Sequence, residues 1–191
     1  MKFTTAAVIA IGLIPLSACT TMAGGSAGAA ASTTMVGGAQ MYPTKNIIEN
    51  AVNSRDHTTL VAAVQAAGLV ETLSGPGPFT VFAPTNSAFA KLPNGTVDTL
   101  LMPANRAMLQ SVLTYHVVPG RVTAAQLMEM IRTGGGQARL TTVQGGVLTA
   151  SVVGGRVMLT DAKGGTAYVT QADVMQSNGV IHVTDSVSLP G

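Results

Sequence analysis

The sequence has no tryptophan, and aromatic and charged residues make up only 4% and 9% of its 191 positions. Hydrophobic residues reach 47%, which is enough to form a core and excludes global disorder. With so few aromatics, that core must consist mainly of valine, leucine, isoleucine, methionine and alanine. The length fits one domain with short extensions, and no internal repeat argues for more.

An excess of charge of one sign is also missing. Ten basic and eight acidic residues give a formal net charge of +2, and the basic residues are scattered along the chain. A surface for nucleic acid or anionic lipid would show a lysine- and arginine-rich stretch. We therefore expect no nucleic-acid partner.

No apolar run is long enough to cross a bilayer, but residues 1–18 have the features of an export signal. Lys2 supplies a positive start, and residues 6–16 form an uncharged apolar run. This run is shorter than the roughly 20 residues that a membrane span needs. Its size and flanks are those of a cleaved signal peptide.

The only cysteine, Cys19, ends the segment Leu-Ser-Ala-Cys at residues 16–19, which resembles the bacterial lipobox. The resemblance implies a lipoprotein signal peptide over 1–18, cleavage before Cys19, and a diacylglycerol on its thiol that anchors the chain to a membrane. The alternative is an ordinary secretory peptide with a free thiol. Lipidation would explain a single cysteine without a disulfide partner in an exported chain. Thr20 in place of aspartate implies the outer membrane in a Gram-negative host, with the periplasmic face or the cell surface as the exposed side.

Residues 20–40 are uncharged and rich in glycine, alanine, serine, threonine and methionine, a composition typical of a flexible tether. A random coil of this length would reach on the order of 25 Å. We assign residues 19–41 to the lipidated cysteine and its tether, and residues 42–191 to the folded domain.

The folded part changes its hydrophobic pattern midway. Apolar stripes and capping residues predict helices near residues 44–52, 56–67, 85–89, 104–113 and 123–133, with a buried strand at 79–82. After Gly136, valine- and threonine-rich runs between glycine turns predict strands at 139–143, 147–153, 156–160, 167–170 and 180–187. Helices followed by strands indicate an α+β fold.

Three stretches, in order, resemble the fasciclin-1 domain. Residues 79–89 read Phe-Thr-Val-Phe-Ala-Pro-Thr-Asn-Ser-Ala-Phe, residues 113–120 read Leu-Thr-Tyr-His-Val-Val-Pro-Gly, and residues 178–185 read Asn-Gly-Val-Ile-His-Val-Thr-Asp. The resemblance implies a short-stranded β-sandwich or wedge flanked by α-helices. It also implies adhesion outside the cytoplasm.

The same resemblance implies candidate partner-binding residues. The Tyr-His pair of animal relatives falls on Tyr115 and His116, and a second adhesion motif, Glu-Pro-Asp-Ile-Met, falls on Gln-Ala-Asp-Val-Met at residues 171–175, which makes Asp173 and Val174 candidates. The missing glutamate and proline depart from that motif. For His116 the alternative is a buried imidazole that ties a helix end to a strand.

Catalytic and metal sites find little support in the sequence. His57, His116 and His182 are far apart, and no phosphate-binding or dinucleotide motif is present. His182 and Asp185 are three apart, so on one strand they would point to opposite faces and could not form a relay. We expect no enzyme activity, no cofactor and no metal.

Two functions remain open. The first is a non-catalytic, monomeric adhesion or interaction module that binds an unidentified envelope protein, surface protein or matrix component. The second is a periplasmic binding protein for a small apolar ligand, or an envelope accessory factor. The ten methionines could line a binding groove, but we expect Met102, Met108, Met128 and Met130 to fill gaps in the core.

Overall fold

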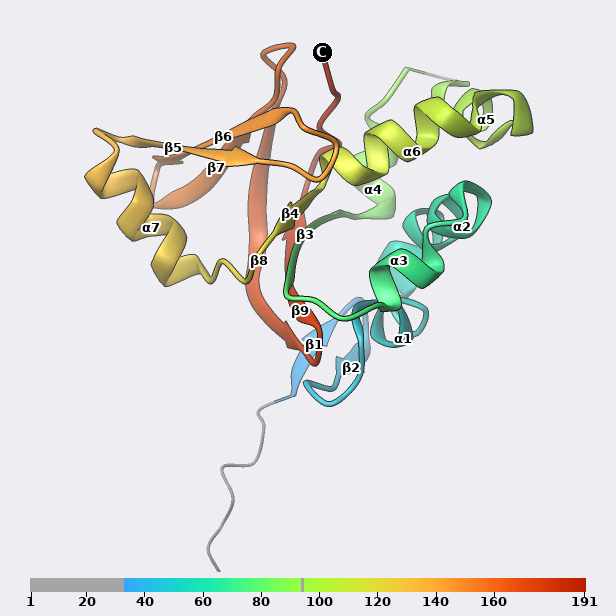
Figure 1. The fold of residues 1–191 in the computed structure, drawn as a ribbon, viewed down its shortest axis with the longest axis horizontal. Coiled ribbons are helices and arrows are strands. Elements are labelled where there is room, and N and C mark those ends of the chain that lie inside the picture. Colours follow the sequence, from blue (N-terminus) through green and yellow to red (C-terminus); the bar gives the residue numbers. More distant parts are fainter. Residues whose placement is uncertain (1–32, 94) are drawn as a thin grey trace, which may run out of the picture. The chain divides into compact units, whose positions relative to one another are not determined.

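A seven-stranded sheet organises residues 33–93 and 95–191, the part of the chain that the computed structural model describes (Figure 1). The strand order is β4-β3-β9-β8-β7-β6-β5, and β3 with β9 is its parallel pair. The strands are β3 (Phe79–Pro84), β4 (Val117–Pro119), β5 (Gln137–Thr141), β6 (Val147–Val153), β7 (Arg156–Thr160), β8 (Thr166–Gln176) and β9 (Gly179–Thr184). The α-helices are α1 (Ile47–Ala51), α2 (Thr58–Ala67), α3 (Val70–Ser74), α4 (Asn86–Ala90), α5 (Thr96–Leu101), α6 (Arg106–Tyr115) and α7 (Ala124–Thr133). The α+β prediction is confirmed.

The sheet curls until its two ends meet. Beyond β5, the backbone N–H of Val143 donates to the carbonyl of Val117 in β4, at 2.7 Å. The curl is helped by β8, whose pairing with β9 shifts register twice between Val169 and Val174. Such bulges bend a strand and increase its twist. The result is a sheet close to a barrel, with its edge strands side by side.

Two hydrophobic cores follow from this shape. The first lies between helices α1–α6 and the β3–β9 pair, with residues such as Val64, Leu113 and Ile181. The second lies inside the curl of β5–β8, where α7 contributes Leu127 and Ile131. The cores are mainly aliphatic, as the shortage of aromatic residues predicts.

The strands β3 and β9 lie side by side within the sheet and are buried along almost their whole length. Buried parallel strands read as continuous apolar runs, which is why residues 79–82 alternate little. Their starts approach very closely, since a Cβ on Gly179 would lie 2.1 Å from the carbonyl oxygen of Phe79. Only glycine fits there.

Several helix-capping residues end or begin helices where the sequence predicts. Thr85 caps α4 by accepting from the N–H of Ala88, and Thr123 with Gln126 forms a complete capping box on α7. Gly68 ends α2 in the left-handed conformation, with φ at +72°. The first helix begins later than expected, because Asn46 caps α1 in a capping box with Glu49.

The predicted boundary at residue 42 is wrong, because a hairpin precedes it. Strands β1 (Thr34–Val36) and β2 (Ala39–Met41) pair across Gly37 and Gly38, whose φ angles of +56° and +75° suit a two-residue hairpin turn. Val36 and Met41 are 5% and 3% exposed and belong to the first core. Strands of three residues are too short to show an alternation of apolar and polar residues. The glycine pairs of this segment therefore indicated a flexible tether and not a hairpin turn. The leader, Cys19 and tether residues 20–32 lie outside the described residues.

Other elements were missed or misjudged. Helices α3 and α5 and strand β4 were not predicted, and β8 extends six residues beyond its predicted end. The four methionines expected in the core lie on helices or beside them, with exposures of 39–59%. Within the described ranges, no helix is long and apolar enough to cross a membrane.

Candidate interaction site

Tyr115 is the last residue of α6, and its side chain is fully buried in the second core. Its hydroxyl donates to the carbonyl of Val147 at 2.8 Å and accepts from the N–H of Ala162 at 3.1 Å. Burial raises the pKa of this phenol. The side chain therefore joins α6 to β6 and to the turn after β7.

His116 follows directly and is only 3% exposed. Its Nδ1–H donates to the carbonyl of Val112 at 2.8 Å, and its Nε2 accepts from the N–H of Ser188 at 3.0 Å. Burial lowers the pKa of His116, so the neutral ring with its proton on Nδ1 is the form that these partners require. The next amide, Leu189 N–H, donates to Asp161 Oδ2 at 2.9 Å, so the C-terminal segment is fixed at two successive residues.

Asp173 lies in the bulged part of β8 with φ at +56°. Its Oδ1 accepts from the N–H of Ala124 at 2.7 Å, which places a carboxylate at the N-terminus of α7, where the helix dipole favours negative charge. Its own N–H donates to Nδ1 of His182 at 3.3 Å. The neighbouring Val174 is 1% exposed and packs in the first core.

The four predicted partner-binding residues thus lie in two separate places, at the end of α6 and on β8. Tyr115, His116 and Val174 are buried, and the carboxylate of half-buried Asp173 is engaged by α7. The folded domain therefore does not expose the side chains of Tyr115, His116 and Val174. For His116, the geometry agrees with the alternative of a buried imidazole that ties elements together.

His182 has structural contacts of the same kind. It is 1% exposed, stacks on Phe82 with ring centroids 5.6 Å apart, and donates from Nε2–H to the carbonyl of Val122 at 2.8 Å. Asp185 has other partners, accepting from the N–H of Tyr168 at 2.9 Å and pairing with Lys91 at 3.3 Å. The two residues do not form a relay, as their spacing predicts.

His57 has a nitrogen without a partner. It is 3% exposed, its Nδ1 shares a hydrogen bond with Ser54 Oγ at 2.8 Å, and its Nε2 makes none. The ring borders a cavity of about 30 Å³ whose other walls are apolar. That volume has room for about one or two water molecules, so it does not suit an organic ligand. Among the described side chains, no three or more histidine, cysteine or acidic groups are placed to hold a metal.

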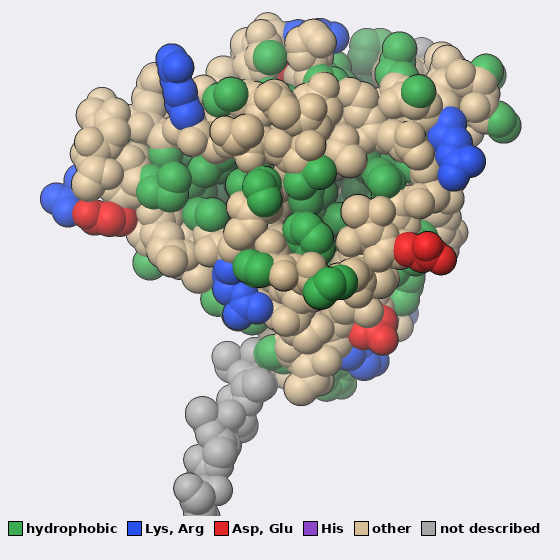
Figure 2. Space-filling model, viewed as in Figure 1, with side chains coloured by type: hydrophobic (Ala, Val, Ile, Leu, Met, Phe, Trp, Pro, Cys, Tyr) green, Lys and Arg blue, Asp and Glu red, His purple; other side chains and the backbone are tan. Residues whose placement is uncertain are grey.

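An exposed surface with the character of a binding site lies elsewhere. Figure 2 shows hydrophobic side chains gathered in a hollow, which in Figure 1 is bordered by α7, β4, α6 and α3. Two separate cavities lie along these elements. Beside α7 lies an open groove of about 540 Å³ lined by Arg121, Val122, Ala125, Gln126, Glu129 and Met130. Beside α3 and α6 lies a small pocket lined by Leu69, Thr72, Leu73, Phe79, Thr114, Val117 and Val143. We call the residues of these two lists the apolar hollow.

The sequence did not reveal this surface. Met130 and Val143 are 39% and 45% exposed, yet they have the residue types that normally indicate a core. The hollow depends on β4 lying between α7 and α6, a strand of three residues that gave no sequence signal. Exposed apolar side chains near a concavity are typical of interaction surfaces.

Comparison with known proteins identifies the class of domain. Residues 55–190 match the family model described as Fasciclin domain, so the chain belongs to the fasciclin domain family. It is 51% identical over 144 residues to protein sll1483 of Synechocystis, covering 75% of this chain and 73% of that protein. It is 37% identical over 145 residues to immunogenic protein MPB70 of Mycobacterium bovis, covering 73% of this chain and 66% of that protein.

The fold has a solved counterpart. A FAS1 domain pair from the insect cell adhesion molecule fasciclin I superposes with a TM-score of 0.67 at 18% identity, over 75% of this chain and 50% of that chain. The predicted fasciclin fold is therefore confirmed. At this identity the likeness concerns the fold alone.

Proposed function

We propose that this chain is a lipid-anchored, non-catalytic fasciclin-domain protein that mediates adhesion or protein–protein interaction at the cell envelope, outside the cytoplasm. The observation that carries the proposal is the fasciclin match over residues 55–190. A likeness in fold to domains of a cell adhesion molecule supports it. The lipobox-like segment supports an anchor on Cys19, with the membrane as one partner.

The histidines support a non-catalytic role. His116 and His182 each have both ring nitrogens in hydrogen bonds with the backbone, and burial lowers their pKa values. A general base needs a free nitrogen within reach of substrate. The ring of His57, whose Nε2 has no hydrogen-bond partner, borders an apolar cavity of about 30 Å³, where a substrate of ordinary size has no room.

The partner surface that we favour is the apolar hollow. Its lining combines exposed apolar groups, such as Val143 and Met130, with the charged groups of Arg121 and Glu129. Protein interfaces likewise combine apolar and polar groups. The partner would be a surface or envelope protein, or a matrix component, with a protruding apolar group.

Deletion of the gene, followed by complementation, tests this function. We expect deletion to reduce cell aggregation or surface attachment, and the natural chain to restore it. Val143→Glu and Met130→Glu should fail to restore it, whereas Met108→Glu should succeed, because Met108 is a more exposed methionine on α6 that lies outside the hollow. Crosslinking in intact cells through the hollow would then identify the partner. Adhesion that is unchanged by deletion would overturn the proposal.

The anchor has its own test. Metabolic labelling with a radioactive fatty acid should mark the natural chain and not the Cys19→Ser variant. If the chain is exported but unlabelled, the cysteine is a free thiol and the anchor is absent.

A further inference from the structure

The N-terminal hairpin has an outward face that the fold does not use. Met35 is 55% exposed, Gln40 pairs with it across the hairpin, and Tyr42 is 39% exposed. The Tyr42 hydroxyl donates to Gln40 Oε1 at 2.9 Å, and Lys45 Nζ lies 5.2 Å from the centre of the Tyr42 ring. These contacts make one continuous surface of Met35, Gln40, Tyr42 and Lys45, which we call the hairpin patch.

The hairpin patch has the chemistry of a membrane interface. Methionine is apolar, tyrosine has an apolar ring with a polar tip, and lysine extends an apolar stem below its charge. Tyrosine and long basic side chains concentrate where acyl chains meet headgroups. The patch is also rigidly held, because Val36 and Met41 of the same hairpin are buried in the first core.

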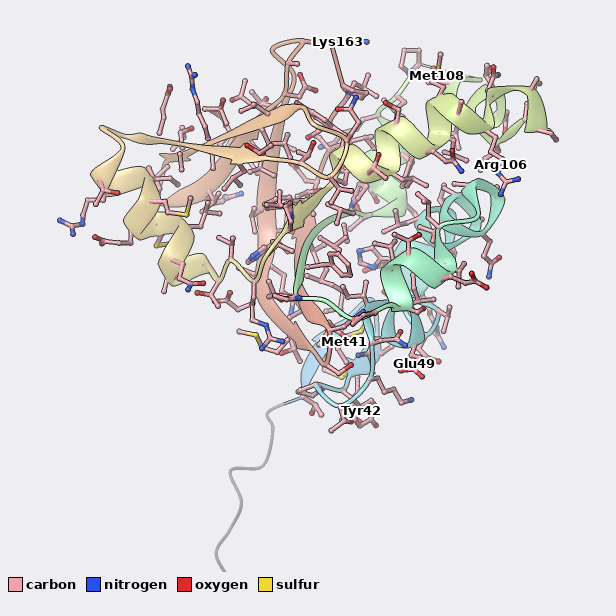
Figure 3. The ribbon with its side chains drawn as sticks, in the orientation of Figure 1. Met41, Tyr42, Glu49, Arg106, Met108 and Lys163 are labelled. Atoms are coloured by element: carbon pink, nitrogen blue, oxygen red, sulfur yellow. The ribbon has the colours of Figure 1, made fainter. Side chains whose placement is uncertain are left out.

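The position of the patch indicates what it meets. Met35 follows Cys19 by 16 positions, a stretch of chain that spans at most about 55 Å. Figure 3 places Met41 and Tyr42 at one end of the domain, and Met108 and Lys163 at the opposite end. The hairpin is thus the first part of the domain after the lipid. A tether raises the effective concentration of the hairpin at the membrane, so that even a weak contact can form.

We propose that the hairpin patch rests on the bilayer that holds the lipid of Cys19. This inference depends on the proposed anchor. The contact is made mainly by the exposed side chains of Met35 and Tyr42. Lys45 is the one cation of the patch, and the nearby carboxylate of Glu49 is occupied in capping α1, where it accepts from the N–H of Asn46 at 2.8 Å. The domain would then stand with its hairpin on the membrane. The end with Met108 and Lys163 would point away from it.

The absence of tryptophan from the chain permits a direct test. The full lipidated protein, as Tyr42→Trp or as Met108→Trp, is reconstituted in vesicles of phosphatidylethanolamine and phosphatidylglycerol with brominated acyl chains. We expect the emission of Tyr42→Trp to be weaker in these vesicles than in vesicles without bromine, and to lie at shorter wavelength than the emission of Met108→Trp. Met108→Trp should keep its emission. Adding Met35→Glu to Tyr42→Trp should restore emission, whereas adding Met108→Glu should not.

Two measurements separate this inference from the anchor. The mass of the purified chain shows the acyl group, and sedimentation with vesicles shows membrane attachment. If the acyl group is missing and the chain does not sediment, both proposals fall. If the chain is acylated and sediments, but Tyr42→Trp is unquenched or quenched no more than Met108→Trp, the anchor stands and the hairpin contact is overturned.

Discussion

At the scale of single residues, His116 shows how a motif can serve the fold. Its ring lies between a carbonyl four residues earlier and an amide 72 residues later, so it fastens the C-terminal segment to the end of α6. We predict that His116→Ala lowers the free energy of unfolding by about 2–4 kcal/mol, because a buried N–H of Ser188 loses its acceptor and a cavity forms. Urea unfolding measures the change.

A matched substitution makes this prediction specific. Met108 lies on α6, the helix that ends just before His116, but is 59% exposed, so Met108→Ala should change the free energy of unfolding by no more than about 0.5 kcal/mol. If His116→Ala has an equally small effect, the imidazole does not act as a structural tie.

At the scale of elements, α7 depends on a residue from another part of the chain. The carboxylate of Asp173 accepts a hydrogen bond from the N–H of Ala124 in the first turn of α7. Its backbone has φ at +56°, a conformation that aspartate and asparagine tolerate better than other non-glycine residues. We predict that Asp173→Ala costs about 1–2 kcal/mol, through loss of the acceptor and backbone strain. Asp173→Asn keeps an acceptor and the conformation, so it should cost less. Hydrogen exchange of the α7 amides should speed up more in the alanine variant, and equal rates in both would contradict this.

The hairpin gives a second prediction at this scale. Met41 is 3% exposed in the first core, whereas Met35 of the same hairpin is 55% exposed. Met41→Ala should destabilise the domain by about 2–3 kcal/mol, and Met35→Ala by less than about 0.5 kcal/mol. Thermal unfolding compares the two. Equal effects would mean that the hairpin is not part of the cooperative fold.

At the scale of the whole molecule, the sequence predicted what depends on neighbouring residues. The capping box of Thr123 and Gln126 and the glycine turns of the later strands act within a few positions, so they could be recognised. The burial of Tyr115 and Val174, and the exposure of Met130, depend on strands that meet only after the sheet curls. The resemblance supplied the fold, but it could not tell which motif residues face solvent.

Acid sensitivity is a property of the whole molecule, because its three histidines are all buried. Burial lowers the pKa values of His57, His116 and His182 below the ordinary 6.5. Asp185 also has a lowered pKa: burial opposes the shift, but the N–H of Tyr168 and the ammonium of Lys91 outweigh it. The ionised carboxylate of Asp185 therefore stabilises the folded domain above pH 3.8, and this contribution is lost as the pH falls below that value.

The histidines set the sign of the effect at milder pH. Above pH 6.5 their rings are neutral in both states, so the free energy of unfolding does not depend on them. Below 6.5 the unfolded chain binds protons that the folded chain excludes, so stability falls by at most about 1.4 kcal/mol per pH unit for each histidine. Urea unfolding across this range should show the decline. The His182→Gln variant should lose stability less steeply with falling pH, because one of the three titrating histidines is absent. A free energy of unfolding that stays constant as the pH falls from 6.5 towards 5 would show that the rings take up protons in the folded domain, and that their backbone hydrogen bonds are not fixed as described.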